Sequence, residues 1–328
     1  MNAVVVAEDV RRSYGDTVAL EGVSLSVGSG EVFALIGPNG AGKTTLVRAL
    51  TGTTEPDSGR ARVLGRPPMD APRNRLGVLP QNFSPPERLT AQELLEYYAG
   101  LYEGSRDPET VLADVGLVDA GDTWYENLSG GQQRRTCVGT ALVNDPEVLF
   151  LDEPTTGIDP AGRRTVWHLV EDLAANGTTV FLTTHDMAEA EHLADRVGLL
   201  AGGELVACGT PEDLITEHGG SSRLIVETST HLDVFSDLAY SVDPHPDGVV
   251  VRDVTTAEIG SVVDALDDRA ITYTGLAWAE PDLEDVYLSL AGATERHRTR
   301  RGRFSSRPVL DGAGVDERPT GESGGDHR

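Results

Sequence analysis

The stretch GPNGAGKTT at residues 37–45 decides the fold of this chain. It follows the apolar run VFALI (32–36) and leads into a helical pattern that carries Leu46, Val47 and Leu50, so it lies on a strand-to-helix turn. In that context a glycine-rich loop binds phosphate, because its backbone N–H groups can converge on one anion and the helix adds its positive dipole end. The residues expected to bind are Gly37, Pro38, Asn39, Gly40, Ala41, Gly42, Lys43, Thr44 and Thr45.

Lys43 is the only lysine in the chain, since the other 26 of its 27 Lys and Arg residues are arginines. A compact, strongly hydrated ammonium is therefore kept at the one place where a point charge on phosphate is wanted. The loop predicts that Lys43 reaches the β- and γ-phosphates of a nucleotide and that the Thr44 hydroxyl ligates Mg²⁺. For the bare pattern, the alternative is a glycine-rich turn that matches by chance.

Length, charge and cysteine content limit the class of protein. A chain of 328 residues predicts a large domain plus a small one. The net charge of −26 argues against a nucleic-acid partner, which requires a basic surface, and favours a strongly solvated one. Cys137 and Cys208 lack metal-ligand spacing and are expected to be small buried hydrophobes. Without a long apolar run or a signal-peptide pattern, the chain is expected to be cytoplasmic.

Two acids mark the end of a predicted buried strand at 148–152. Asp152 is the last residue of the strand, and Glu153 follows it directly. An acid at the carboxyl end of a parallel strand, beside a phosphate loop, can hold Mg²⁺ through its water shell while its neighbour orients water. This pattern assigns a metal role to Asp152 and a base role to Glu153. His185 ends a second predicted strand at 179–184 and can contact a γ-phosphate, although a single histidine there is a weak signal.

The pentapeptide LSGGQ (128–132) directly precedes a helix-compatible run. Ser129, Gly130 and Gly131 at a helix N-terminus predict a second anion site, separate from the phosphate loop. A simple helix cap is the alternative for this pentapeptide alone.

The segments on either side of these motifs have different textures. Residues 4–27 alternate short apolar segments with turns and predict an antiparallel β-layer. Within it, Tyr14 lies where a ring can stack on adenine, although a half-buried strand tyrosine fits the pattern equally well. Between 85 and 128 the pattern becomes helical, with one face expected to contain Leu94, Leu95, Tyr98, Leu101 and Tyr102.

The carboxyl-terminal part predicts a small α+β domain of ferredoxin-like type. Its expected strands are 223–227, 249–251 and 271–277, and its expected helices are 232–238, 259–266 and 283–290. It carries no convergent catalytic set, so we expect a regulatory or dimer-supporting module. The polar segment from 294 to 328 is expected to be disordered. Its stretch 295–307 holds six arginines and one glutamate, which fits either a solvated tail or contact with anionic lipid.

The motifs together resemble the ATP-binding subunit of ABC transporters over residues 1 to about 217. GPNGAGKTT, Gln81, LSGGQ, VLFLDEP, the loop at 157–160 and TTHDMAEAE occur in the order and spacing of that family. Within it, the segment from Val78 to Tyr102 and the sequence PDLEDVYLSLAG (281–292) resemble the daunorubicin-resistance type of exporter ATPase. The loop before Asp159 reads Thr-Gly-Ile where Ser-Gly-Leu is commoner, a change that keeps the hydroxyl and the volume.

This resemblance implies an α/β fold of the P-loop NTPase class and the ABC ATPase type. The expected parts are an ATP-binding domain at 1–217 with a helical subdomain at about 85–128, an accessory domain at 218–293 and a tail at 294–328. It also implies that two subunits close head to tail around two ATP molecules. Each ATP would lie between the phosphate loop of one subunit and Ser129, Gly130, Gly131 and Gln132 of the other.

By the same resemblance, Tyr14 stacks on the adenine and Asp159 communicates across the dimer. Gln81 senses the Mg²⁺ site, takes part in catalysis and couples to the membrane subunit. The implied function is ATP hydrolysis that powers a separate multi-pass permease, with the chain bound peripherally at the cytoplasmic side of the membrane. The expected cargo is a drug-like or lipophilic compound that is exported.

Two other classes of function compete with this one. A non-transport ABC ATPase acting on DNA or ribosomes is disfavoured by the ordinary helical insertion between Lys43 and Ser129 and by the single copy of each motif. A catalytically silent regulatory binder is disfavoured because Lys43, Asp152, Glu153 and His185 are all present.

Overall fold

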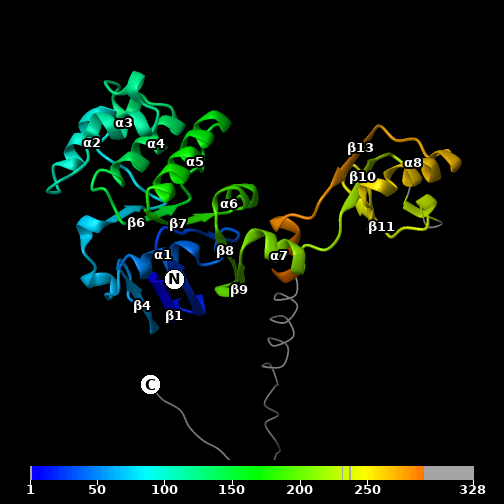
Figure 1. Ribbon diagram of the computed structural model, residues 1–328, viewed down its shortest axis with the longest axis horizontal. Coiled ribbons are helices and arrows are strands. Elements are labelled where there is room, and N and C mark those ends of the chain that lie inside the picture. Colours follow the sequence, from blue (N-terminus) through cyan, green and yellow to red (C-terminus); the bar gives the residue numbers. More distant parts are fainter. Residues whose placement is uncertain (1, 231, 236–237, 292–328) are drawn as a thin grey trace, which may run out of the picture.

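The computed structural model describes residues 2–230, 232–235 and 238–291 (Figure 1). Its first layer is a three-stranded antiparallel sheet of order β2-β1-β4. The strands are β1 (Ala3–Tyr14), β2 (Thr17–Gly28) and β4 (Ser58–Val63). Gly15, with φ +57°, makes the tight turn between β1 and β2. The predicted antiparallel layer before the phosphate loop is therefore confirmed.

The central layer is a six-stranded sheet of order β5-β6-β7-β3-β8-β9. All pairs are parallel except β8 with β9. The strands are β3 (Val32–Ile36), β5 (Leu76–Leu79), β6 (Val148–Asp152), β7 (Thr179–Thr184), β8 (Arg196–Ala201) and β9 (Glu204–Gly209). Every residue of β3, β6 and β7 is buried, which explains why these strands have continuous apolar or β-branched sequences. Their carboxyl ends meet at one edge of the sheet.

Hydrophobic clusters cover both faces of this sheet. On one face, α1 (Lys43–Leu50) packs with the antiparallel layer, and Phe33, Phe150 and Phe181 meet there at centroid distances of 5.4 and 5.7 Å. On the other face lie α5 (Pro160–Ala175), α6 (Met187–Leu193) and α7 (Pro211–His218). The phosphate loop, Glu153 and His185 thus follow strands that are fixed from both sides.

The helical subdomain contains α2 (Ala91–Ala99) and α3 (Pro108–Asp114), and α4 (Gly130–Thr140) packs with them (Figure 1). Leu94 and Leu95 are fully buried, as predicted. The prediction was wrong for Leu101, which is 61% exposed. The reason is that α2 ends at Ala99, so Leu101 lies beyond the helix and leaves its apolar face.

A second, smaller domain has a four-stranded antiparallel sheet of order β11-β12-β10-β13. Its elements are β10 (Arg223–Glu227), a 3₁₀ turn (Leu232–Phe235), β11 (Val242–His245), β12 (Gly248–Arg252), α8 (Ile259–Asp268) and β13 (Gly275–Ala279). This βαββαβ order is that of ferredoxin-like folds. The predicted helix at 232–238 is only this short turn within the described residues, and the strand predicted at 271–277 begins at Gly275.

The helix at 283–291 packs away from the small domain. Leu283 and Val286 are fully buried in the same cluster as Ala190 and Leu193 of α6, and Leu290 packs against it. Spaced at i, i+3 and i+7, these three side chains form an apolar stripe that needs a partner surface. The predicted accessory domain, 218–293, included this helix. In the structure the chain leaves the ATP-binding body after α7 and returns to it with this helix (Figure 1).

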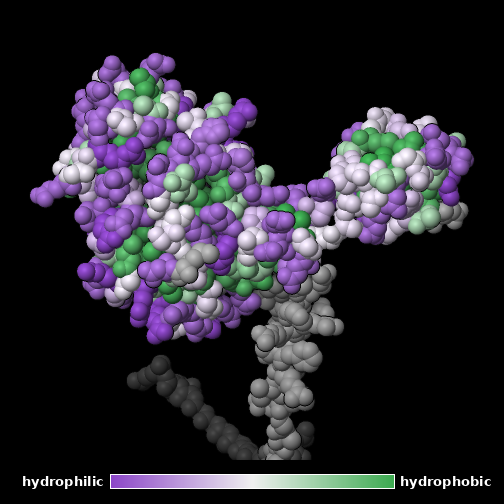
Figure 2. All heavy atoms as spheres, viewed as in Figure 1, coloured by the Kyte–Doolittle hydropathy of each residue, from purple (hydrophilic) through white to green (hydrophobic). Residues whose placement is uncertain are grey.

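In Figure 2, hydrophilic residues cover most of the visible face of the larger body. None of the helices in the described part of the chain is long and apolar enough to cross a membrane. Cys137 is buried, but Cys208 is exposed, which corrects the expectation for that residue. It lies on the edge strand β9, where Arg196 Nη2 donates a hydrogen bond to its Sγ at 3.3 Å. The tail predicted at 294–328, with its arginine-rich stretch, lies outside the described residues.

Candidate nucleotide-binding and catalytic site

The phosphate loop requires glycine at two positions where other backbone comes close. Gly42, with φ +109°, is the N-cap of α1, and a Cβ there would lie 2.4 Å from the carbonyl oxygen of Ala19. A Cβ on Gly37 would lie 2.4 Å from the carbonyl oxygen of Leu200. Neither backbone atom can move aside without disturbing the sheet, so larger residues are excluded from both positions.

The loop opens onto a cavity of about 690 Å³. This volume is within the usual range for small-molecule sites, roughly 300–1,000 Å³. The cavity combines residues from four of the predicted motifs with the first residues of β2. It is lined by Thr17, Val18, Ala19, Pro38, Asn39, Gly40, Gly42, Lys43, Thr44, Thr45, Gln81, Glu153, Thr156 and His185.

Lys43 is held at the base of this cavity by three oxygens. Its Nζ donates to the carbonyl oxygens of Gly37 at 2.7 Å and Pro38 at 3.2 Å, and lies 3.2 Å from Glu153 Oε1. The side chains of Lys43 and Glu153 are each only 5% exposed. A buried ammonium is tolerated only with such compensation. The arrangement places one positive charge beside the curled backbone N–H groups.

Glu153 faces Lys43 on one side and His185 on the other. Its Oε2 accepts a hydrogen bond from Thr156 Oγ1 at 3.2 Å and lies 3.5 Å from His185 Nδ1. Burial opposes its ionisation, but the hydrogen bond and charge of Lys43, aided by His185 and Thr156, hold the pKa of Glu153 below its ordinary value. Its φ of +52° is uncommon for a side chain of this size and is typical of strained functional positions.

Thr44 and Gln81, which line the cavity, and Asp152, which ends β6 outside the cavity wall, carry the oxygens that Mg²⁺ prefers. Thr44 Oγ1 donates to Gln81 Oε1 at 3.2 Å, and the buried Asp152 accepts from Thr183 Oγ1 at 2.5 Å. These uncharged and carboxylate oxygens fit Mg²⁺, which keeps several waters and shares phosphate oxygens of its substrate. Across the described ranges, no group of three or more His, Cys, Asp and Glu side chains could hold a metal by itself. The donor set therefore fits a magnesium ion that nucleotide oxygens also ligate.

Tyr14 lies at the end of β1, beside the cavity but outside its wall. The residue is 44% exposed, and the Arg12 guanidinium lies 5.0 Å from its ring centroid. Burial opposes ionisation of the phenol, but hydrogen bonding with Arg12, Thr54 and Thr45 lowers the pKa of Tyr14. Thr45 lines the cavity, so Tyr14 borders the nucleotide site. Its stacking on adenine stays a prediction.

The residues Ser129 to Gln132 lie outside this cavity. Ser129 is the N-cap of α4 and forms a reciprocal capping box with Gln132: Ser129 N donates to Gln132 Oε1 at 2.9 Å, and Gln132 N donates to Ser129 Oγ at 3.3 Å. Asp159 caps α5, and a Cβ on Gly131 would lie 3.4 Å from its Oδ1. The structure thus groups Asp159 with the LSGGQ loop, apart from the Lys43 cavity.

Sequence reasoning missed Arg134. Its guanidinium is largely buried and donates to the carbonyl oxygens of Asp152 at 2.6 Å, Glu153 at 2.8 Å and Pro154 at 3.3 Å. Burial lowers the pKa of Arg134. The only signal in the sequence was an arginine in the first turns after LSGGQ, and nothing local linked it to the strand end at Asp152. This side chain joins α4 to the loop that carries Glu153.

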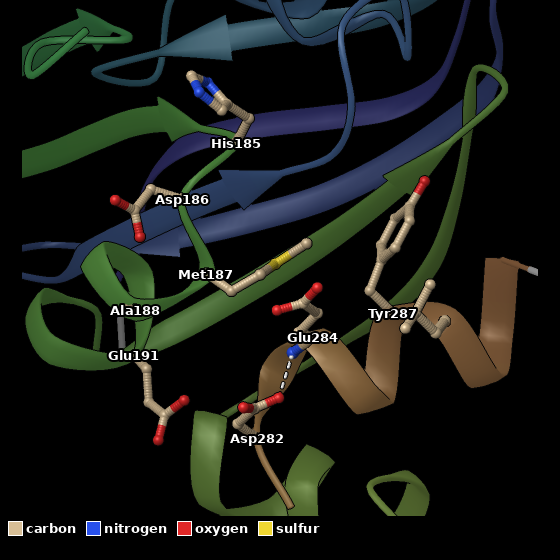
Figure 3. A pocket seen from close by; sticks show the side chains of 9 residues that line it. His185, Asp186, Met187, Ala188, Glu191, Asp282, Glu284 and Tyr287 are labelled. Atoms are coloured by element: carbon tan, nitrogen blue, oxygen red, sulfur yellow. Dashed lines mark hydrogen bonds between the residues drawn. The ribbon is translucent and has the colours of Figure 1, made fainter. Parts of the chain in front are cut away.

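A second cavity, of about 410 Å³, adjoins the first at His185. Figure 3 shows it between the segment from His185 into α6 and the helix at 283–291. The first side contributes His185, Asp186, Met187, Ala188 and Glu191, and the second contributes Asp282, Glu284, Tyr287 and Leu288. The helix that returns from the small domain therefore lines the cavity next to the one that contains Lys43.

Comparison with known proteins identifies the family. The family model described as "ABC transporter" matches residues 20–156. The daunorubicin resistance ATP-binding protein DrrA3 of Streptomyces coeruleorubidus is 36% identical to this chain, over 90% of the chain and 98% of that protein. The chain belongs to the ABC transporter ATP-binding family. As a member of that family, it binds and hydrolyses ATP.

Other relatives of this ABC ATPase agree in extent. The Nod factor export ATP-binding protein I of Rhizobium meliloti (strain 1021) is 37% identical over 86% of each chain. Among solved structures, one titled as the ATP binding subunit of an ABC transporter superposes with a TM-score of 0.60 at 28% identity, covering 66% of this chain and 93% of that one. The dimeric structure of the cassette MJ0796 gives 0.57 at 25% identity, covering 63% and 98%. These likenesses confirm the predicted ABC ATPase fold.

Proposed function

We propose that this ABC ATPase powers a separate multi-pass membrane permease that exports a drug-like or lipophilic compound. The proposal is supported by relatives named for drug resistance and for Nod factor export, which are at least 35% identical over most of the chain. In this role the chain is held at the cytoplasmic face of the membrane by the permease. Co-purification from membranes of the source cell, followed by identification of the bound protein, tests this arrangement.

The convergence of Lys43, Glu153 and His185 on one cavity carries the proposed mechanism. Lys43 and the loop N–H groups bind the β- and γ-phosphates, and Glu153 orients the attacking water and accepts its proton. His185 contacts the γ-phosphate on the far side of Glu153. Thr44 and Gln81 would hold Mg²⁺ directly, and Asp152 would hold it through a water. When bound, the ion neutralises charge on the phosphate oxygens.

We propose that each nucleotide-binding site is completed by a second copy of this chain. The LSGGQ loop offers an anion site at the N-terminus of α4, and its residues do not line the cavity around Lys43. A head-to-tail pair would bring Ser129 to Gln132 of one copy over the phosphate loop of the other. Asp159, which lies beside Gly131, would then border the same contact.

Glu153→Gln tests the catalytic assignment. The amide keeps the shape of the side chain but cannot accept the proton, so hydrolysis should slow by roughly 10²- to 10⁴-fold. ATP binding, measured with a fluorescent nucleotide, should persist because the phosphate loop is untouched. Lys43→Ala should instead weaken binding itself. A Glu153→Gln protein that turns over ATP at the wild-type rate would rule out this role.

Mixing two inactive variants tests the shared site. Lys43→Ala damages the phosphate loop, and Ser129→Arg blocks the LSGGQ loop. In a mixed pair, one of the two composite sites combines both intact parts, so ATPase activity should reappear although neither variant has it alone. Pairs shown to be mixed by differential tagging that still lack activity would contradict the arrangement in trans.

A further inference from the structure

Glu189 is a fully buried carboxyl that the proposed mechanism does not use. It lies on α6, four residues after His185, and has 0% exposure. Burying a carboxyl group is costly unless hydrogen bonds or opposite charges compensate its oxygens. Its retention among apolar residues such as Ala190 and Leu193 therefore calls for a specific contact.

The two oxygens of Glu189 are used unequally. Oε1 accepts hydrogen bonds from Thr155 Oγ1 at 2.7 Å and from Trp167 Nε1 at 3.0 Å. Oε2 is buried and has no hydrogen-bond partner in the part of the chain that the structure describes. Glu189 is therefore held through Oε1, while the burial of its Oε2 is not compensated by a hydrogen bond among the described residues.

Thr155 lies in the middle of the loop that carries the proposed chemistry. It comes two residues after Glu153 and four before Asp159. Its carbonyl accepts from Ile158 N at 3.1 Å, while Thr156 next to it donates to Glu153. Thr155 therefore belongs to the turn between Glu153 and the cap of α5, and its hydroxyl is the group that bonds to Glu189.

The other end of the contact is equally well fixed. Asp186 caps α6 by accepting from Glu189 N at 3.2 Å, and Arg163 of α5 donates to Asp186 at 2.7 Å. Trp167, the second donor to Glu189, also lies on α5. The helix α6, which starts two residues after His185, is thereby tied to α5. Among the described residues, the bond between Glu189 and Thr155 is the one side-chain hydrogen bond that joins α6 to the loop from Glu153 to Asp159.

We propose that Glu189 is a positioning residue for ATP hydrolysis: through Thr155 it holds the loop of Glu153 and Asp159 at a fixed distance from His185. This inference rests on the catalytic role proposed for Glu153. Glu189 acts without contacting the nucleotide or the attacking water. Its effect is transmitted by one hydrogen bond.

The test compares the two donors to the same oxygen in the full-length protein. Thr155→Val and Glu189→Leu each remove the bond to the loop, and should lower kcat roughly 10- to 100-fold with ATP affinity unchanged, since small displacements of a reacting group have effects of that size. Trp167→Phe removes the other bond and should lower the melting temperature while kcat stays within about threefold of wild type. Glu189→Gln retains an acceptor oxygen and should likewise recover kcat to within about threefold, although its NH₂ group lacks a partner.

Three outcomes would overturn the inference: wild-type kcat in Thr155→Val, an equal loss of kcat in Trp167→Phe, or weakened ATP binding in Glu189→Leu. Glu191→Leu, on the exposed side of the same helix, controls for loss of an acid from α6. The double variant Thr155→Val with Glu189→Leu should be no slower than the slower single variant, because both remove the same bond. Glu153→Gln is measured in parallel. If it retains full activity, the proposed function fails, whereas a slow Glu153→Gln beside a fast Thr155→Val rejects only the role of Glu189.

Discussion

Lys43 and Glu153 come from motifs 110 positions apart in the numbering, yet they form one buried ion pair. Each was predicted from its own local pattern, a glycine-rich turn and an acid at a strand end. Their contact follows from the parallel sheet, in which β3 and β6 flank β7 and end at the same edge. The local motifs predict the roles of the two residues, and the strand order of the sheet brings their side chains together.

The pair makes a prediction about stability and pH at the level of one residue. The pKa of Glu153 lies below its ordinary value of 4.5 in the folded protein. Ionised Glu153 therefore stabilises the fold above about pH 4.5, and this contribution is lost as the pH falls through the folded pKa. The wild type should melt higher than Glu153→Gln near pH 7, and the difference should shrink below about pH 4.5. A difference that stays constant over that range, with Glu191→Gln as control, would contradict the pairing.

At the scale of elements, prediction succeeded where the sequence pattern of a strand or helix reflects how it is buried. β3, β6 and β7 are buried on both faces, and their continuous apolar or β-branched sequences were recognisable. It failed where tertiary contacts set the boundary. Leu101 fits the helical period but follows the end of α2, and β13 begins only where its register with β10 starts at Gly275. Arg134 was invisible because its partners are backbone carbonyls of a distant loop.

Arg134 makes a prediction for the junction between α4 and the catalytic loop. Its guanidinium serves carbonyls of three successive residues, beginning at Asp152, and a lysine cannot reproduce that fork. Arg134→Lys should therefore cost about 1–3 kcal/mol of stability, the typical penalty for buried polar groups left unpaired. Chemical denaturation measures this cost, and the exposed Arg164→Lys on α5 should change it by less than about 0.5 kcal/mol. Equal stability in both variants would mean that water replaces these hydrogen bonds.

For the whole molecule, the sequence predicted the ATP-binding fold, its ferredoxin-like companion and the grouping of most cavity residues. It placed the last helix within the small α+β domain at 218–293, because the apolar stripe of Leu283, Val286 and Leu290 indicates only that a partner surface is needed. The partner is the ATP-binding body, since Leu283 and Val286 belong to the same buried cluster as Ala190 and Leu193 of α6. Such a choice depends on surfaces that form only after the chain has folded.

The docking of this helix can be tested with a matched pair of substitutions. Leu283 is fully buried and Leu288 is 63% exposed on the same helix. Leu283→Ala should cost about 2–5 kcal/mol, and Leu288→Ala less than about 0.5 kcal/mol. Hydrogen exchange should rise in α6 of the Leu283→Ala protein and stay unchanged in β10 and β12. Faster exchange in the small domain instead would place the helix there.

Because the chain enters the small domain from α7 and returns through a docked helix, that domain is a closed insert rather than an appendage. The entropy of closing such an insert grows slowly, by about 0.6 kcal/mol for each doubling of its length. The stability of the ATP-binding body should therefore depend little on the length of the inserted domain, provided that the separation of the two attachment points is kept. A change in the length or packing of the small domain should therefore leave the nucleotide site intact, as long as α7 and the helix at 283–291 stay attached to the body.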